Sequence, residues 1–109
     1  MDTRKYSSKQ EKHVAKQLGG KVQPNSGATP FLKGDVTIGK DWLLECKTQT
    51  TNKKSITIKK EWLTKLEEER FAMRRVDSAL AFNFGPDEPV YYIIKEKTFK
   101  ELIRRETDV

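Results

Sequence analysis

Two short runs of β-type residues, Asp35–Ile38 and Trp42–Thr48, are separated by only three residues, Gly39-Lys40-Asp41. Such a short spacing that begins with a glycine predicts a tight hairpin. The hairpin makes these two strands neighbours in a sheet. It also brings Asp35, at the start of the first run, toward the end of the second run. Any fold for this chain has to accommodate that pair of strands.

The remaining segments alternate between helical and strand patterns. Helices are predicted at Ser8–Leu18, Lys59–Arg75 and Lys95–Arg105, and further strands at Ser78–Phe84 and Val90–Ile94. Val22–Lys33 is predicted to be a loop with room for a short first strand, and Ser55–Ile58 is either a short strand or an extended lead into the second helix. The order α-β-β-β-α-β-β-α predicts an α/β (α+β) fold in a single domain, with a mixed sheet of about five strands and flanking helices.

The charge balance of the chain favours a polyanionic partner. Lysine and arginine total 22 against 16 aspartate and glutamate residues, which gives a net charge of +6, and nucleic acid is the leading candidate. A single cysteine, Cys46, excludes a disulfide framework and a cysteine-based zinc cluster. Because no apolar leader or membrane-length run is present, we expect a cytoplasmic protein with no membrane partner.

Three ionisable groups are predicted to meet near the end of the hairpin. Side chains alternate across a strand, so Glu45 and Lys47 share one face and Cys46 points to the other. Asp35 approaches them across the Gly39 turn. Two carboxylates and a backbone carbonyl make an oxygen-rich site of the kind that Mg²⁺ prefers. We therefore expect Asp35, Glu45 and the Cys46 carbonyl to bind Mg²⁺, with Mn²⁺ as a substitute.

Such a site suits phosphodiester hydrolysis. The reaction needs a metal ion to position a water, lower its pKa and neutralise the charge that builds on the phosphate. Lys47 would orient that water or stabilise the transition state. A Glu-x-Lys pair alone is more often an ordinary surface pair. Here it follows an apolar run, and Gly34-Asp35-Val36 stands at hairpin distance, so the sequence favours a metal-dependent nuclease.

The motif Gly34-Asp35, nine residues, then Glu45-Cys46-Lys47 resembles the signature of the PD-(D/E)XK nuclease superfamily, with glycine in place of the proline of its name. With Asn25-Ser26-Gly27-Ala28 before it, Thr48 after it and Ser55-Ile56-Thr57-Ile58 further on, Ser8 to about Phe84 is more closely similar to the archaeal and phage-type Holliday junction resolvases. The resemblance implies a restriction-endonuclease-like core, Mg²⁺ held by acidic residues, and a homodimer with two active sites on one four-way DNA junction.

Three further residues are candidates for this site, each with an alternative. Glu11 lies on the same helical stripe as Val14 and Leu18, and the resemblance implies that it joins the metal site; it also completes a capping box with Ser8. Ser26 is similar to a serine used near the scissile phosphate, but a serine before glycine is also ordinary turn chemistry. Gln49 continues the face of Glu45 and Lys47, although a glutamine at a strand end often has no special role. His13, the only histidine, is left outside the site.

Two lysine clusters are predicted to contact DNA phosphates without reading bases. They lie at the start of the first helix and around Ser55–Ile58, and their members are Lys5, Lys9, Lys12, Lys53, Lys54, Lys59 and Lys60. Any one of these lysines is more often a solvated surface residue, so the prediction concerns the clusters. Nothing resembles a base-reading element, which favours recognition of branched DNA shape over recognition of sequence.

Symmetric cleavage of a junction needs two sites, and a two-fold dimer supplies them. Several apolar residues exceed the needs of a thin core and are candidates for its interface: Phe71, Met73, Phe82, Phe84, Tyr91 and Tyr92. Two other functions stay open. One is another PD-(D/E)XK DNA nuclease acting in restriction, repair or end processing. The other is a DNA-binding module without catalysis, which the intact Asp35, Glu45 and Lys47 disfavour.

Overall fold

The computed structural model describes residues 3–23 and 35–108. Their elements run in the order α1 (Thr3–Leu18), β1 (Lys21–Val22), β2 (Val36–Ile38), β3 (Trp42–Lys47), α2 (Lys60–Ala72), β4 (Asp77–Phe82), β5 (Tyr91–Ile93) and α3 (Glu96–Thr107). The strands form one sheet in the order β1-β2-β3-β4-β5, antiparallel except for the parallel β3–β4 pair. The α+β class, the mixed five-stranded sheet and the element order predicted from the sequence are confirmed.

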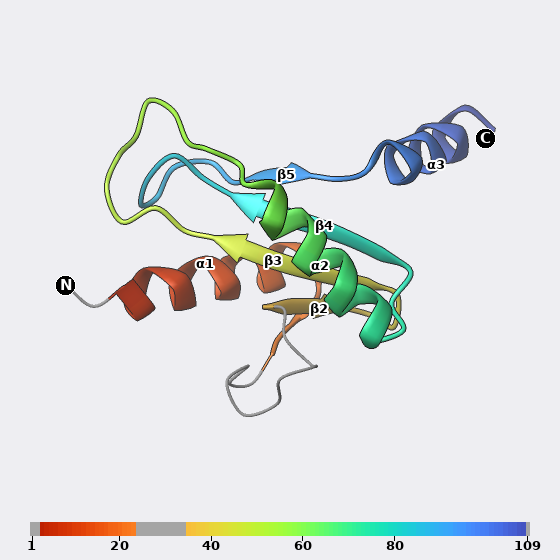
Figure 1. Cartoon of the computed structure of the whole chain (residues 1–109), viewed down its shortest axis with the longest axis horizontal. Helices are drawn as coiled ribbons and strands as arrows, with labels where there is room; N and C mark the ends of the chain where they lie inside the picture. The colour runs from red at the N-terminus through yellow and green to blue at the C-terminus, as the bar shows by residue number, and fades with distance from the viewer. Residues whose placement is uncertain (1–2, 24–34, 109) are drawn as a thin grey trace.

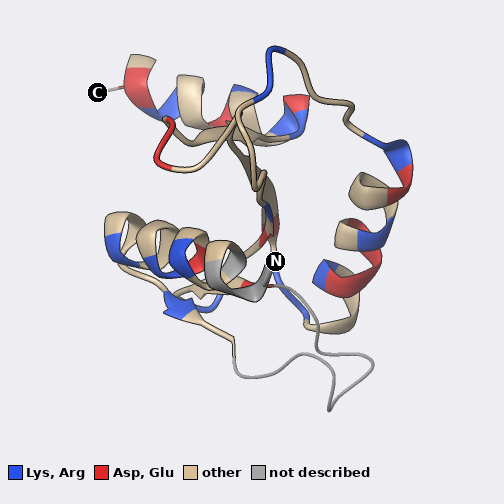
Figure 2. Cartoon of the chain, turned by 90° about the vertical axis from the view of Figure 1, so that its left-hand side faces the viewer, with Lys and Arg blue, Asp and Glu red and all other residues tan. Residues whose placement is uncertain are grey.

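The sheet lies between α1 on one face and α2 on the other (Figures 1 and 2). Each face has its own apolar core. On the α1 side the buried residues are Val14, Ala15, Val36, Leu44, Ala79 and Ala81, and on the α2 side they are Leu43, Leu66 and Leu80. The two faces use alternate residues of β3 and β4, as strand geometry requires. Both central strands are therefore covered on both sides.

The hairpin is built by the predicted residues. Val36 pairs with Leu44 and Ile38 with Trp42, which leaves Gly39-Lys40-Asp41 as the turn. Gly39 has φ +54°, a conformation that glycine adopts with little strain. Just before the paired residues, the Asp35 N–H donates to the Leu44 carbonyl at 2.9 Å. The hairpin thus carries its two carboxylates to the same end of the sheet.

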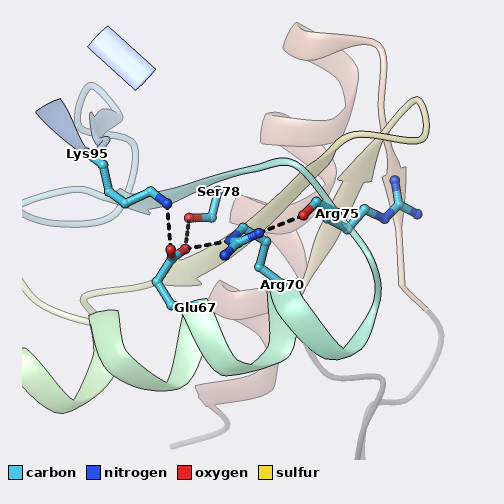
Figure 3. Close-up of polar contacts among 5 residues, drawn as sticks. All are labelled: Glu67, Arg70, Arg75, Ser78 and Lys95. Atoms are coloured by element: carbon cyan, nitrogen blue, oxygen red, sulfur yellow. Dashed lines mark hydrogen bonds and ion pairs between the residues drawn. The ribbon is translucent and has the colours of Figure 1, made fainter. Parts of the chain in front are cut away.

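Glu67 joins α2 to the sheet and to the segment before α3 (Figure 3). Its carboxylate accepts hydrogen bonds from Lys95 Nζ at 2.6 Å, Ser78 Oγ at 2.7 Å and Arg70 Nε at 3.1 Å. Burial alone would raise the pKa of Glu67, but these hydrogen bonds and the Arg70 charge together lower it below its usual value. Arg70 also donates to the Arg75 carbonyl at 2.8 Å, which ties down the turn after α2.

Several predicted boundaries need correction. The first helix begins at Thr3, not Ser8, so Ser8 lies inside α1 and the predicted capping box is wrong. The third strand ends at Lys47, one residue earlier than predicted. Ser55–Ile58 is an extended lead into α2 and belongs to no strand. On α2, Leu66 is buried, and Trp62, Leu63 and Met73 pack against the same core.

Helix α3 lies at the end of β5, apart from the layers formed by α1, the sheet and α2 (Figure 1). In residues 3–23 and 35–108 it makes only marginal contact with the other helices and strands. Its apolar side chains Phe99, Leu102 and Ile103 are 53%, 40% and 48% exposed. These three, spaced three and four residues apart, form one helical stripe, which we call the α3 stripe. None of the helices within the described ranges is long and apolar enough to span a bilayer.

Candidate active site

Asp35 immediately precedes β2, and its carboxylate accepts a hydrogen bond from the backbone of β3. The Cys46 N–H of β3 donates to Asp35 Oδ2 at 2.7 Å. A side chain thereby continues the β2–β3 ladder beyond the last paired residue. Because this bond fixes the carboxylate against β3, Asp35 is held beside the strand that carries Glu45 and Lys47.

Glu11 reaches the same place from α1. Its carboxyl group is hydrogen-bonded to the Asp35 side chain, which joins the helix to the end of β2. Burial, the negative charge of Asp35 and this hydrogen bond, in that order, raise the pKa of Glu11 to about 7. The predicted inward position of Glu11 is thus confirmed, and its contact is with Asp35, not with a helix cap.

Glu45 and Lys47 share the α2 face of β3. Lys47 Nζ lies 3.7 Å from Glu45 Oε1 and 4.7 Å from the centroid of the Trp62 ring on α2. The ring therefore offers the ammonium group a cation–π contact on one side, while the carboxylate attracts it from another. The Glu45 side chain is only 24% exposed and that of Lys47 31%. Lys47 is restrained by two neighbours within a partly enclosed setting.

The charge of Asp35 disfavours the charged forms of both Glu11 and Glu45. Burial, followed by the charge of Asp35, raises the pKa of Glu45 to about 7, and burial also raises the pKa of Asp35. Lys47 and Lys65 act in the opposite direction on both groups. Shifts of this kind are common where a site is built to bind a cation or exchange a proton. A positive charge bound beside these carboxyl groups would lower their raised pKa values.

The carboxylates do not form a ready-made metal cluster. In the part of the chain that the structure describes, no three His, Cys, Asp or Glu side chains are grouped closely enough to hold a metal ion. Asp35 instead links two pairs, one with Glu11 and one with Glu45. Mg²⁺ is commonly bound by one or two carboxylates with its remaining positions filled by water. Asp35 together with one of the two glutamates therefore suits Mg²⁺. A site in which all three carboxylates surround the ion is not what the structure presents among the residues that it describes.

An open groove of about 820 Å³ runs from Glu45 and Lys47 along α2. Trp62, Lys65 and Glu69 of α2 line it, and none of the three was predicted to belong to the site. The signal was present in the sequence, because residues 62, 65 and 69 follow one another at helical spacing beside the buried Leu66. Their contribution could not be predicted without knowing that this face of α2 lies over the end of β3.

Comparison with protein-family models, curated proteins and solved structures gives no match for this chain. The resemblance to the nucleases therefore rests on the residues themselves. Four of those residues, Glu11, Asp35, Glu45 and Lys47, are brought together by the fold. They come from α1, the start of β2 and β3, and their contacts are the basis for any assignment of function.

The other predicted site residues have different outcomes. Gln49 lies two residues beyond the end of β3, so strand alternation no longer places it with Glu45 and Lys47; its N–H donates to Asn83 Oδ1 at 3.5 Å. Ser26 lies outside the described residues. Burial raises the pKa of the Cys46 thiol, with the nearby carboxylates adding to the effect, and the side chain packs against the α1 core. The Cys46 side chain is thus a packing residue, and the binding of Mg²⁺ by the Cys46 carbonyl stays a prediction.

The predicted DNA-contacting lysines occupy two regions of the surface. Lys53, Lys54, Lys59 and Lys60 are exposed before and at the start of α2, and Lys60 also lines the groove. On α1, Lys12 is exposed and Lys9 pairs with Asp87 at 2.5 Å, which offsets its charge. Lys5 lies in α1, but its side chain is outside the described part. His13 is exposed beside a smaller cavity of about 210 Å³, away from the groove.

Proposed function

We propose that this protein is a Mg²⁺-dependent, structure-selective DNA endonuclease, with a four-way junction as its substrate. The observation that carries the proposal is the meeting of Glu11, Asp35 and Glu45 beside Lys47. Partly buried carboxylates with raised pKa values beside a lysine suit metal-assisted phosphodiester hydrolysis. The junction as substrate comes from the resemblance to the resolvases.

The charge of the groove supports a metal cofactor. Its lining holds four glutamates, Glu45, Glu61, Glu68 and Glu69, against three lysines, Lys47, Lys60 and Lys65. The acidic residues of this groove outnumber the basic ones by one, so the lysines alone give an entering phosphodiester little attraction. A divalent cation held by Asp35 and Glu45 would shift that balance. Bound there, Mg²⁺ would supply Lewis-acid activation of water and phosphate.

Each protein group then has a definite task. Asp35 and Glu45 present oxygen ligands, and the Cys46 N–H keeps Asp35 aimed at β3. Glu11 shares a proton with Asp35 through their hydrogen bond, and release of that proton to solvent when a cation arrives would give the pair its second negative charge. Lys47 places a positive charge where the phosphate becomes more negative in the transition state. Trp62 and Glu45 limit the positions that the Lys47 ammonium group can take.

A cleavage assay on several DNA structures tests the proposal. We expect Mg²⁺ to be required, and paired symmetric nicks to appear on a synthetic four-way junction much faster than cuts on duplex, flap or single-stranded DNA of the same sequence. Equal cleavage rates on all substrates would support nuclease activity and would rule out the four-way junction as the preferred substrate. Absence of Mg²⁺- or Mn²⁺-dependent cleavage on every substrate would leave a DNA-binding module without catalysis.

We further propose that two copies associate through the α3 stripe. Isolated helices of about 12 residues are marginally stable in water, and α3, with 12 residues, buries little of its stripe within its own chain. Its first turn carries Glu96 and its last turn Arg104 and Arg105. Antiparallel packing of two such helices would place these opposite charges side by side. The interface residues predicted from the sequence did not include any residue of α3.

Leu102→Glu should therefore convert a dimer into a monomer, because it places a charge in the middle of the proposed interface. Light scattering after gel filtration measures the mass directly. Phe71→Glu is the matched control: Phe71 is 79% exposed at the end of α2 and was an interface candidate from the sequence, but it lies outside the α3 stripe. A monomeric wild-type protein, or a dimer lost only with Phe71→Glu, would refute this interface.

A further inference from the structure

Gln10 is a buried polar residue on the side of α1 that faces the sheet. It is only 5% exposed, and it lies one helical turn before Val14, which is fully buried in the α1 core. An apolar side chain would suit that position, because burying an amide is unfavourable unless its hydrogen bonds are satisfied. The presence of glutamine here therefore needs a specific reason.

The partners of Gln10 are two consecutive residues at the end of β3. Its Nε2 donates to the Lys47 carbonyl at 3.4 Å, and its Oε1 accepts a hydrogen bond from Thr48 Oγ1 at 2.5 Å. On the β4 side, Asn83, also 5% exposed, accepts from the Gln49 N–H. Two buried amides thus hold the three residues with which β3 leaves the sheet.

We propose that Gln10 is a positioning residue, which sets the distance between α1 and the end of β3 and so aligns Glu11 with Asp35, Glu45 and Lys47. The inference rests on the proposed function, since it concerns the same metal site. Gln10 precedes Glu11 on the helix, and Lys47 is both its hydrogen-bond partner and a site residue. Gln10 and Thr48, which are joined by a hydrogen bond, are therefore each next in sequence to a site residue: Glu11 on α1 and Lys47 on β3.

The apolar packing of α1 cannot fix this alignment by itself. Val14 and Ala15 contact the sheet through side chains that have no directional bonds, so their packing sets how close the helix lies to the sheet more than where it lies along the sheet. The Gln10–Thr48 hydrogen bond is directional and opposes such a shift. A shift of about 1 Å in the groups that surround a site is enough to disturb its function.

The test compares Gln10→Met with the wild-type protein, with Mg²⁺ affinity measured by calorimetry and junction cleavage measured in parallel. Methionine keeps the size of glutamine and removes both hydrogen bonds. We expect Mg²⁺ affinity to fall about tenfold, as for other residues that orient metal ligands. Val14→Ala is the matched control, because it weakens the packing of the same helix and leaves both hydrogen bonds of Gln10 in place, and its Mg²⁺ affinity should stay within about twofold of the wild type.

Thr48 provides a second route to the same result. Thr48→Val removes the hydroxyl group and should weaken Mg²⁺ binding as Gln10→Met does, whereas Thr48→Ser keeps the hydroxyl and should restore it. The double variant should be no worse than Gln10→Met alone, since Gln10→Met already breaks the bond with Thr48. Wild-type Mg²⁺ affinity in Gln10→Met and Thr48→Val, or an equal loss in Val14→Ala, would overturn the positioning role.

The measurements also separate this inference from the proposed function. A wild-type protein that binds Mg²⁺ but cuts no DNA would overturn the nuclease, while the calorimetric comparison would still decide the role of Gln10. A wild-type protein that binds no Mg²⁺ would overturn both. Normal cleavage by the wild type with unchanged Gln10→Met affinity would overturn the positioning role alone.

Discussion

Asp35→Asn is expected to lower the rate of Mg²⁺-dependent DNA cleavage by roughly 10³-fold, the loss expected when a principal charge-stabilising group leaves an active site. Asparagine has nearly the same shape, and its Oδ1 can still accept the Cys46 N–H, so the β2–β3 connection should survive. The change removes the negative charge that both carboxylate pairs share. Single-turnover cleavage of a labelled junction measures the effect.

Two controls make that result specific. The affinity of Asp35→Asn for DNA should stay within a few-fold of the wild type, because the proposed phosphate contacts come from lysines elsewhere on the surface. Asp108→Asn carries the same change of charge at the exposed end of α3 and should cleave normally. Wild-type cleavage by Asp35→Asn would show that the proposed metal site is wrong.

Mg²⁺ binding should strengthen steeply as the pH rises toward 8. The pKa values of Glu11 and Glu45 are raised to about 7, so below that pH the cation must displace protons. Each displaced proton changes the apparent affinity about tenfold per pH unit. The two groups interact through Asp35, so they should titrate together. We expect at least a tenfold gain per unit between about pH 5.5 and 7, levelling off above 8.

The same groups should make the metal-free protein less stable at alkaline pH. A carboxyl group whose pKa is raised on folding contributes stability below its unfolded value, and that contribution is lost as the pH rises through the folded value. For Glu45 the change from 4.5 to about 7 amounts to at most about 3 kcal/mol. Glu67, with its lowered pKa, acts oppositely below about pH 4.5, so the loss should be seen between about pH 5 and 8.

Urea unfolding across this range measures the effect. The free energy of unfolding should fall with pH in the absence of metal, and Mg²⁺ should restore it at pH 8. Glu45→Gln has no titrating group at position 45 and should make the curve shallower, with the contribution of Glu11 remaining. An identical pH dependence of the free energy of unfolding in Glu45→Gln and the wild type would show that Glu45 is not its cause.

The hairpin and its carboxylates could be predicted from the sequence because every signal was local. A glycine turn of three residues fixed the register of β2 and β3, and strand alternation then placed Glu45 with Lys47. Glu11 could be predicted for a similar reason, since helical spacing put it in line with Val14. These inferences needed no knowledge of how distant elements pack.

The features that were missed depend on such packing. Trp62 and Lys65 enter the site only because the parallel crossover lays α2 over the end of β3. Ser8 looked like a cap because the helical pattern begins there, yet α1 extends five residues further toward the N-terminus. The exposure of α3 follows from its few contacts with the other helices and strands. The sequence of α3 itself does not reveal those contacts.

The parallel pairing of β3 with β4 has a consequence for the synthesis of the protein. Glu45 is paired with Leu80 and Lys47 with Phe82, so the strand that carries both residues gains its second neighbour only after α2 has been made. A nascent chain that ends before Asp77 leaves that side of β3 without a partner. The residues up to Phe82 must therefore be synthesised before β3 has both of its neighbours, so a product that ends before Asp77 should not assemble the proposed site.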